Sequence, residues 1–354
     1  MRMSAAHTYK RLLTPRAAAS PSPPQTLADD IERKVLEIIA HFSREGHGLP
    51  TSIRARAEEA GTPLSERELI YLIPIWSESS LITGWELLEA DCVAAKGDVS
   101  LAIARMEKTL LWRRTENVED IQAMANDCKA QAATGQNIIM GFTKQNRPII
   151  YFFPNRNTTP VEERKSIHNI FMIERASDLM TGGIGSALRA RAVATTHGAD
   201  AQATPWSSLA SEEAKGSIRE SNRKRSSHLF APQNARETMH ILSEYYPETL
   251  HTSHFLGMHW IVRAFVNLVW PFVDAKTKQK VNFETDIVGA GDVEPGELLR
   301  ECGGELDLPY DHETYWSTML EVGKERREDQ MRRWRALGEP QVGREERLFK
   351  VAPE

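Results

Sequence analysis

The chain has 354 residues and a formal net charge of −5, with 41% hydrophobic and 26% charged residues. This length fits roughly two domains, or one large domain with additions, and the charge balance argues against a strongly basic nucleic-acid-binding protein. No uninterrupted apolar run reaches the ~18 residues of a membrane span. Cys92, Cys128 and Cys302 are far apart and odd in number, which argues against a disulfide scaffold and fits a reducing compartment.

Residues 1–26 are expected to form a disordered tail. They contain Arg2, Lys10, Arg11 and Arg16, no acidic residue, and the proline-rich stretch SPSPPQ. The lack of an apolar run argues against a secretion signal. An acid-poor start with arginines also fits a mitochondrial transit peptide, but prolines disfavour the amphipathic helix that such a peptide needs.

Residues 27–134 are predicted to form a helical N-terminal lobe. Two stretches repeat apolar residues at helical spacing, and Asp98 stands where the second helix needs an N-cap. The apolar positions are Ile31, Val35, Ile38, Ile39 and Phe42 in the first stretch, and Val99, Ala102, Ile103, Met106 and Leu110 in the second.

Residues 135–304 are predicted to form an α/β domain. Two strand-like runs, Asn137–Phe142 and Pro148–Phe153, flank the polar turn TKQNR and indicate a β-hairpin. Helical and strand-like segments then alternate, including the helix ARETMHILSEYYPE, the strand SHFLGM and the turn and strand DAKTKQKVNF. This order predicts a mixed, partly parallel sheet flanked by helices.

Two segments are expected to lie outside that sheet. Residues 186–232 are rich in Ala, Ser, Arg and Glu, which favours a long, exposed and poorly ordered insert. Residues 305–354 are predicted to form a C-terminal amphipathic helix and a loose tail. The sequence ERREDQMRRWR within it is interpreted as a solvated helix face rather than a nucleic-acid-binding patch, because acids interrupt the basic residues.

The common enzyme signatures are absent from the sequence. There is no G-x-S-x-G elbow, no G-x-x-x-x-G-K-[ST] loop and no H-E-x-x-H motif. His251, His254 and His259 are close in sequence, but His251 and His254 would point to opposite sides of a strand. We therefore expect no catalytic residue, no cofactor and no metal site.

The segment Trp260–Val273 is the most apolar part of the chain, with eleven apolar or aromatic residues out of fourteen. Arg263 and Asn267 would form one narrow polar stripe on a helix. Such a helix is either buried or in contact with lipid, and it is too short to cross a bilayer. A static core helix is the simpler alternative.

Six segments carry a resemblance to a known family: DVSLAIARMEKTLLWRR, TGQNIIMGFTKQNRPIIYFFPNRNTT, IHNIFMIERASDLM, ARETMHILSEYYPETL, HWIVRAFVNLVWPFVDAKTKQKVNF and GGELDLPYDHETYW. In type and order they resemble the CRAL-TRIO family, and most closely its fungal phosphatidylinositol-transfer branch. The resemblance spans roughly residues 85–185 and 233–340. It implies a helical lobe and an α/β lobe whose deep apolar pocket holds one phospholipid under a mobile lid helix.

The resemblance also implies roles for particular residues. The lid would carry Trp260, Phe265, Val269, Trp270 and Phe272. The lipid head group would be held by Glu248, Thr277, Lys280 and Lys96. An ammonium and a hydroxyl can donate to a phosphate, and a carboxylate can accept from inositol hydroxyls. Spacing alone would make Glu248 and Lys280 two unrelated surface charges.

This sequence departs from the family pattern in three respects that bear on the pocket. The segment ITGWELLEADCVAAK keeps little of the family's usual LLRFLRA text. The strand that usually follows the ERxxDLM helix is not recognisable, and residues 186–232 stand in its place. Ala95 replaces a residue that could reach a phosphate, whereas Lys96 remains. Loss of a central strand would leave backbone groups of its neighbours unpaired.

The sequence thus predicts a non-catalytic protein that binds a phospholipid and transfers it between membranes. Phosphatidylinositol is the expected ligand, exchanged with phosphatidylcholine. The alternatives are another apolar ligand such as a sterol, or a degraded pocket retained as an interaction scaffold. A cytoplasmic protein that touches membrane surfaces transiently and binds no nucleic acid is expected, and the oligomeric state is left open.

Overall fold

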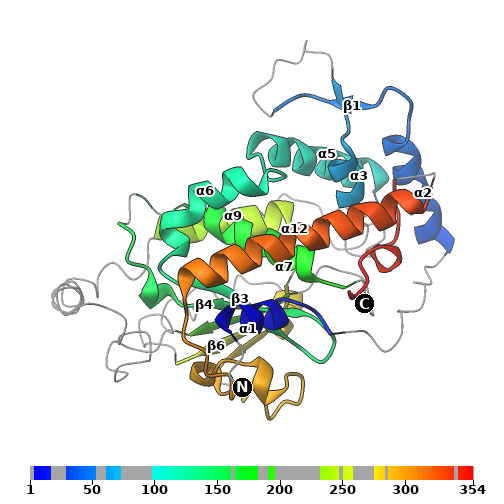
Figure 1. The fold of residues 1–354 in the computed structure, drawn as a ribbon. Coiled ribbons are helices and arrows are strands. Elements are labelled where there is room, and N and C mark those ends of the chain that lie inside the picture. Colours follow the sequence, from blue (N-terminus) through cyan, green and yellow to red (C-terminus); the bar gives the residue numbers. More distant parts are fainter. Residues whose placement is uncertain are drawn as a thin grey trace.

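The computed structural model describes residues 4–16, 29–52, 61–72, 98–160, 163, 165–181, 190–195, 232–246, 250–257, 275–283, 286–338 and 342–353. A five-stranded sheet in the order β3-β4-β5-β6-β7 lies at its centre (Figure 1). The strands are β3 Asn137–Phe142, β4 Pro148–Phe152, β5 Ala190–Thr195, β6 Leu250–Leu256 and β7 Val281–Phe283.

The sheet is mixed, as the sequence predicts. Strands β3 and β4 form the predicted antiparallel hairpin, and its turn contains Asn146 with a φ of 57°, a conformation that asparagine tolerates better than most residues. Each later strand runs parallel to the one before it. The prediction of a partly parallel sheet flanked by helices is confirmed.

Strand β5 corrects the expectation that residues 186–232 form only a loop or disordered insert. Ala190–Thr195 lies in the middle of the sheet and pairs with β4 on one side and β6 on the other. The sequence ARAVAT is poor in β-branched and aromatic residues, so its strand propensity is weak. Hydrogen bonding to a strand on each side stabilises this segment as a strand, although its local propensity is weak. The central strand of the sheet is therefore present. Residues 196–231 lie outside the described part of the chain.

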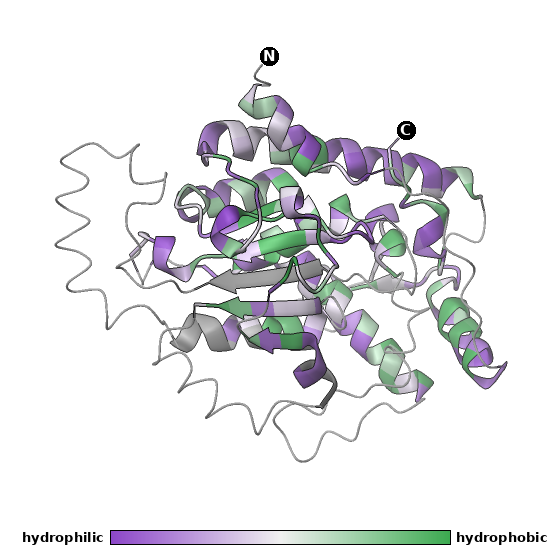
Figure 2. Cartoon of the chain, turned by 90° about the horizontal axis from the view of Figure 1, so that it is seen from below, coloured by the Kyte–Doolittle hydropathy of each residue, from purple (hydrophilic) through white to green (hydrophobic). Residues whose placement is uncertain are grey.

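Helices α6 Ile121–Ala132, α7 Ile167–Leu179, α9 Pro232–Tyr245 and α12 His312–Ala336 gather on one side of the sheet (Figure 1). Helix α7 contacts the sheet directly and supports α6 and α12. Tyr315 of α12 reaches the sheet, where its hydroxyl accepts from the Ile139 amide at 2.8 Å. Figure 2 shows hydrophilic and hydrophobic residues mixed along the helices around the sheet, the pattern of elements that are buried on one side only.

A smaller core lies among the first elements. Helix α2 Asp29–Phe42 contacts α5 Val99–Thr115, and both helices match the predicted apolar spacing. Asp98 caps α5 by accepting from the amides of Ser100 and Leu101. Also near this core are β1 Gly48–Leu49, β2 Thr62–Pro63 and α3 Glu66–Tyr71. Helix α6 packs instead in the main core, through Met124 and Cys128.

Short elements complete the described part of the chain. They are α11 Ala275–Lys280 and the 3₁₀ turns Pro154–Arg156, Pro295–Glu297, Arg300–Cys302 and Glu346–Leu348. Helix α11 replaces the turn that the sequence DAKTKQK predicts. No helix among the described residues is long and apolar enough to cross a membrane.

Both ends of the chain are more structured than the sequence predicts. Residues Ala5–Leu12 form helix α1, which packs on α12 and β3. Tyr9 and Leu12 are fully buried in the main core. The proline-rich stretch that suggested a disordered tail lies after this helix, so it does not interrupt it. Near the other end, Phe349 is fully buried beside Trp334, where a loose tail was expected.

We predict that replacing Leu12 by alanine lowers the free energy of unfolding by about 2–5 kcal/mol, the usual cost of such a cavity in a core. The matched control is His7→Ala, an exposed position of the same helix, which should stay within about 0.5 kcal/mol of the wild type. Urea denaturation of the two variants measures the difference. Equal stability of both would mean that α1 is the disordered tail that the sequence suggests.

Candidate functional site

Two of the four predicted head-group residues, Thr277 and Lys280, lie in the short helix that comes just before strand β7. Lys280 is the last residue of α11 and is half-buried immediately before β7. Thr277 belongs to the same helix, three residues earlier, and positions at this spacing share one helix face. Glu248 and Lys96 lie outside the described residues, although Tyr246 and Leu250 on either side of Glu248 are described.

The register of the sheet relates these positions to one another. Strands β6 and β7 are parallel, and Ser253 is level with Val281. Leu250, the first residue of β6, and Val281, the first residue of β7, therefore lie toward the same end of the sheet. Parallel neighbours bring their equivalent ends together, which is what a shared head-group site requires. The role of each residue stays a prediction.

An apolar surface adjoins this edge. The rings of Phe255 on β6 and Phe283 on β7 are 5.6 Å apart and tilted by 30°, and both side chains are half-buried. They are partners in the register, so they lie on the same face of the sheet. Val281 shares that face, because it is two residues before Phe283. A cationic side chain and an apolar surface thus lie within one short segment.

The predicted lid residues Trp260, Phe265, Val269, Trp270 and Phe272 all lie outside the described residues. They fall between strand β6, which ends at Leu256, and helix α11, which begins at Ala275. The role of these five residues as a lid stays a prediction.

A network of buried charges contacts Tyr246, which comes four residues before β6 in the sequence. Arg113 of α5 donates to both carboxylate oxygens of Glu174 on α7, at 2.7 and 3.1 Å. It also donates to Glu119 at 2.5 Å. The side chains of Arg113 and Glu174 are 3% and 7% exposed, so each is stable there only because the other offsets its desolvation.

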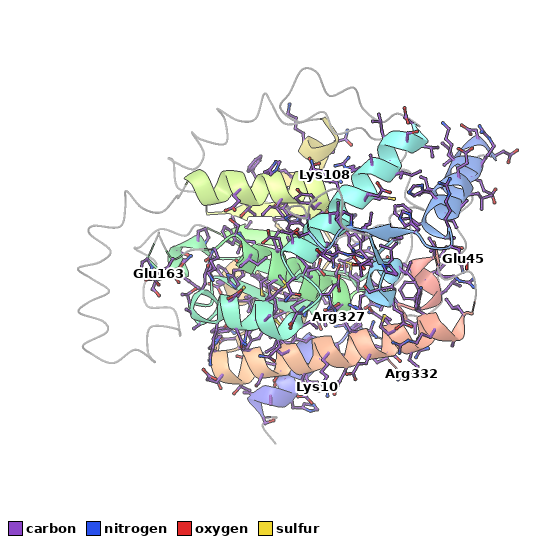
Figure 3. All side chains as sticks on the ribbon, turned by 90° about the horizontal axis from the view of Figure 1, so that it is seen from above. Lys10, Glu45, Lys108, Glu163, Arg327 and Arg332 are labelled. Carbon is purple, nitrogen blue, oxygen red and sulfur yellow. The ribbon has the colours of Figure 1, made fainter. Side chains whose placement is uncertain are left out.

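Helix α12 completes this network, which joins α5, α7 and α12. Arg327 donates to Asp178 at 2.7 Å and to Glu174 at 3.3 Å. Its side chain is 8% exposed. The basic sequence of α12 is therefore not only the solvated face that was predicted, because one of its arginines ties the helix to the core. Figure 3 shows Arg327 in the interior and Arg332 at the outer side of the same helix.

The network keeps Glu174 ionised. Burial alone would raise the pKa of Glu174, but the charges of Arg113 and Arg327, with hydrogen bonds from Arg113 and Tyr246, hold it well below the ordinary value of 4.5. Tyr246 donates its hydroxyl to Glu174 at 2.7 Å. Burial, and then the Glu174 charge, raise the pKa of Tyr246 well above its usual value, so this hydroxyl remains a donor.

Aromatic contacts also hold Tyr246 and the tyrosine before it in place. Tyr245 stacks on Trp112 with ring centroids 4.4 Å apart, and Tyr246 meets the edge of Trp112 at 5.8 Å. Both tyrosines belong to the YYPE sequence, whose last residue is Glu248. Position 248 is thus two residues from a side chain that is held by a ring contact and by a hydrogen bond to a buried carboxylate.

A cavity of about 60 Å³ adjoins the network, lined among others by Arg67, Tyr71 and Lys350. Since a water molecule occupies about 30 Å³, this cavity can hold water but not a phospholipid. The network is therefore not itself the ligand pocket. Its contribution to the candidate site is to hold Tyr246 in place, four residues before β6.

The sequence analysis missed the residues of this network. Arg113 and Glu174 are 61 positions apart, and Glu174 and Arg327 are 153 positions apart. A single sequence gives no sign that such distant charges meet. The available signal was local: Arg113 follows a tryptophan on an apolar helix, and Glu174 interrupts the apolar run IFMIER, where a lone charge needs a buried partner.

Comparison with known proteins finds a family match in this region. Residues 221–304 match the CRAL/TRIO domain, a range that contains α9, β6, α11, β7 and the predicted lid. The resemblance to the CRAL-TRIO family is thereby confirmed.

The relatives extend the similarity over most of the chain. The chain is 28% identical over 278 residues to a CRAL-TRIO domain-containing protein of Schizosaccharomyces pombe, covering 75% of this chain and 24% of that one. It thus spans about a quarter of the length of that relative. It is 25% identical over 308 residues to the phosphatidylinositol transfer protein PDR17 of Saccharomyces cerevisiae, covering 84% of this chain and 77% of PDR17. A similar solved structure is the crystal structure of Sfh5, at 13% identity and a TM-score of 0.45, covering 86% of this chain and all of that one.

We predict that Arg327→Met lowers the free energy of unfolding by about 3–5 kcal/mol, because Glu174 and Asp178 then lose a buried counter-charge. The matched control is Arg332→Met on the same helix, where the side chain is 72% exposed and the change should stay within about 0.5 kcal/mol. Chemical denaturation of both variants is the measurement. If the free energy of unfolding fell by the same amount in both variants, the network would make no special contribution to stability.

Proposed function

We propose that this chain binds one phospholipid, with phosphatidylinositol as the ligand, and transfers it between membranes without catalysing a reaction. In this proposal the protein is cytoplasmic and touches a membrane surface only during exchange. The phosphate and inositol lie at the edge where β6 and β7 begin, and the acyl chains lie against the apolar face beside it.

The observation that carries the proposal is the position of Lys280. A phospholipid needs a cation for its phosphate next to an apolar surface for its chains. Lys280 stands at the entry to β7, three residues before Phe283, whose ring contacts Phe255 of the neighbouring strand. This combination lies inside the segment that matches the CRAL/TRIO domain, and PDR17, by its name, transfers phosphatidylinositol.

The presence of β5 weakens the alternative of a degraded pocket. That alternative rested on the loss of a central strand, and the sheet is continuous from β3 to β7. The desolvation of acyl chains supplies the binding free energy, at about 0.8 kcal/mol for each buried methylene. Inositol differs from choline in having hydroxyls, which a carboxylate at Glu248 would accept.

We predict that Lys280→Ala weakens the binding of phosphatidylinositol about 10- to 100-fold, since a hydrogen bond to a charged group is worth about 1.5–3 kcal/mol. Binding of phosphatidylcholine should change little. The matched control is Lys278→Ala in the same short helix, which should bind both lipids as the wild type does. Vesicles that carry one labelled lipid at a time provide the measurement. Equal loss of both lipids in Lys280→Ala would show that this residue only supports the start of β7.

A second prediction concerns the segment between β6 and α11. Replacing Phe265 and Val269 together by aspartate should abolish lipid transfer between vesicles, because an opened lid with two charges cannot enter the apolar part of a membrane interface. The control is the double replacement of Leu36 and Leu101 by aspartate, two exposed leucines elsewhere. Circular dichroism of both proteins should remain that of the wild type. Normal transfer by the Phe265 and Val269 variant would show that the lid proposal is wrong.

A further inference from the structure

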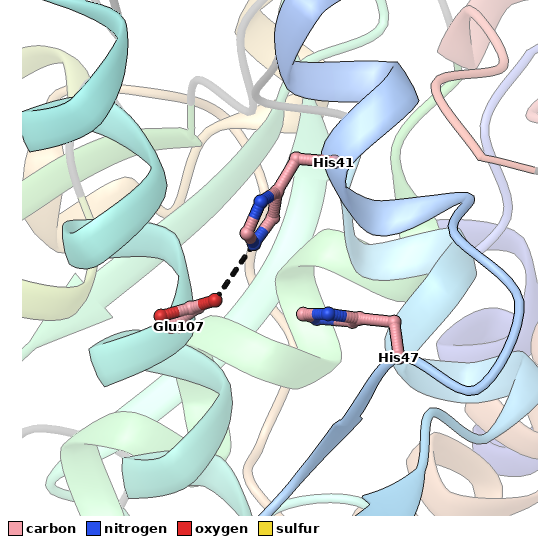
Figure 4. A group of neighbouring side chains, drawn as sticks. All are labelled: His41, His47 and Glu107. Atoms are coloured by element: carbon pink, nitrogen blue, oxygen red, sulfur yellow. Dashed lines mark hydrogen bonds and ion pairs between the residues drawn. The ribbon is translucent and has the colours of Figure 1, made fainter.

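Three potential metal ligands meet in the small N-terminal core, far in sequence from the CRAL/TRIO match. They are His41, His47 and Glu107, and one ligand atom from each lies within 4.8 Å of the other two (Figure 4). The Nε2 atom of His41 is 2.8 Å from a carboxylate oxygen of Glu107, and the rings of the two histidines are 4.8 Å apart. All three side chains are partly buried.

The local fold explains why these residues meet. His41 lies in the last turn of α2, and a tight turn then brings His47 back beside it just before β1. The turn is closed by hydrogen bonds from the Arg44 amide to His41 and from the His47 amide to Arg44. Gly46 has a φ of 75°, which glycine adopts without strain. Glu107 comes from the facing side of α5, which packs on α2.

His47, the histidine in the turn, has a ring nitrogen that is available to bind a metal ion. The Nε2 atom of His47 is buried and has no hydrogen-bond partner among the described residues. A neutral imidazole with a free ring nitrogen is the form that binds a metal ion.

We propose that His41, His47 and Glu107 form a Zn²⁺ site that links α2, the turn before β1, and α5. Two imidazoles and one carboxylate are a ligand set that zinc accepts, with a fourth position left for water. Ligands at 2.0–2.2 Å from zinc are about 3.3 Å from one another in a tetrahedron. The His41–Glu107 pair is already near that spacing, and the widest gap of 4.8 Å closes if the His47 side chain moves by about 1.5 Å.

The structure also suggests what the ion would do. The described side chains of the small core include Val35, Ile38 and Phe42 of α2 and Leu110 of α5. A metal ion would add a link between α2, the turn before β1 and α5, because binding to the folded state alone raises stability. The site lies outside the proposed lipid-binding edge, so lipid transfer and zinc binding can fail independently.

The test uses the purified full chain, stripped of metal with a chelator that is then removed. Titration with Zn²⁺ against a chromophoric competitor should show one site per chain, and thermal unfolding should shift upward when zinc is added. Both His47→Ala and Glu107→Gln should lose affinity by at least about 100-fold, since even outer-sphere partners of a metal site change affinity by 10- to 100-fold. Glutamine can still accept the hydrogen bond from His41, so Glu107→Gln tests the site without disturbing the fold.

The matched controls are His7→Ala and Glu37→Gln, which remove an exposed histidine and an exposed glutamate outside the cluster. Both should bind zinc as the wild type does. Visible absorption of the Co²⁺-substituted wild type should disappear in Glu107→Gln and persist in the controls. The proposal is overturned if the wild type binds no zinc at micromolar concentrations, or if its affinity is unchanged in both cluster variants.

Discussion

The buried charge network between α5, α7 and α12 is the constraint on which the rest of this structure depends. It places Arg113 and Arg327 against Glu119, Glu174 and Asp178 in a region from which water is largely excluded. Each charge is costly to bury alone, and only the complete set is tolerable. The network therefore fixes the relative positions of three helices more narrowly than apolar packing would, since apolar contacts can slide and a buried bidentate ion pair cannot.

This constraint reaches the candidate lipid site through one residue. Tyr246 donates to the network at Glu174 and contacts Trp112, and β6 begins four residues later at Leu250. On the neighbouring strand, Lys280 occupies the corresponding entry to β7. A head-group site needs polar groups held on rigid elements, whereas exchange of a lipid needs a part that moves. The proposal assigns the first role to the strand ends beside the network and the second to the connection between β6 and α11.

The sequence predicted those features that depend on neighbours along the chain. The apolar spacing of α5 and its Asp98 cap are local, and so are the two strands and polar turn of the β3–β4 hairpin. The sequence did not predict the features that depend on contacts between residues far apart in the chain. Strand β5 has weak propensity and exists because β4 and β6 pair with both of its edges. Helix α1 is held by burial of Tyr9 and Leu12 against segments some 300 residues later, as the hydrogen bond from Tyr9 to Pro309 illustrates.

The candidate site likewise has one part that the sequence predicted and one part that it did not. The motif DAKTKQKVNF located Lys280 beside the start of a strand, because the strand signal follows it directly. The network behind the site was invisible, since its charges come from three helices far apart in sequence. The cluster of His41, His47 and Glu107 was also not predicted, because it forms only when the turn after α2 and the packing of α2 on α5 bring the three residues together. Contacts between charged residues far apart in the chain could thus not be predicted from this one sequence.

The most direct test of the proposed function is to identify what the protein carries. The full chain would be purified without detergent, extracted with organic solvent and examined by mass spectrometry, with the Phe265 and Val269 aspartate variant treated in parallel. We expect close to one phospholipid per chain in the wild type, with phosphatidylinositol enriched over its share in the host membranes. Recovery of a sterol in that amount, or of no lipid at all, would contradict it.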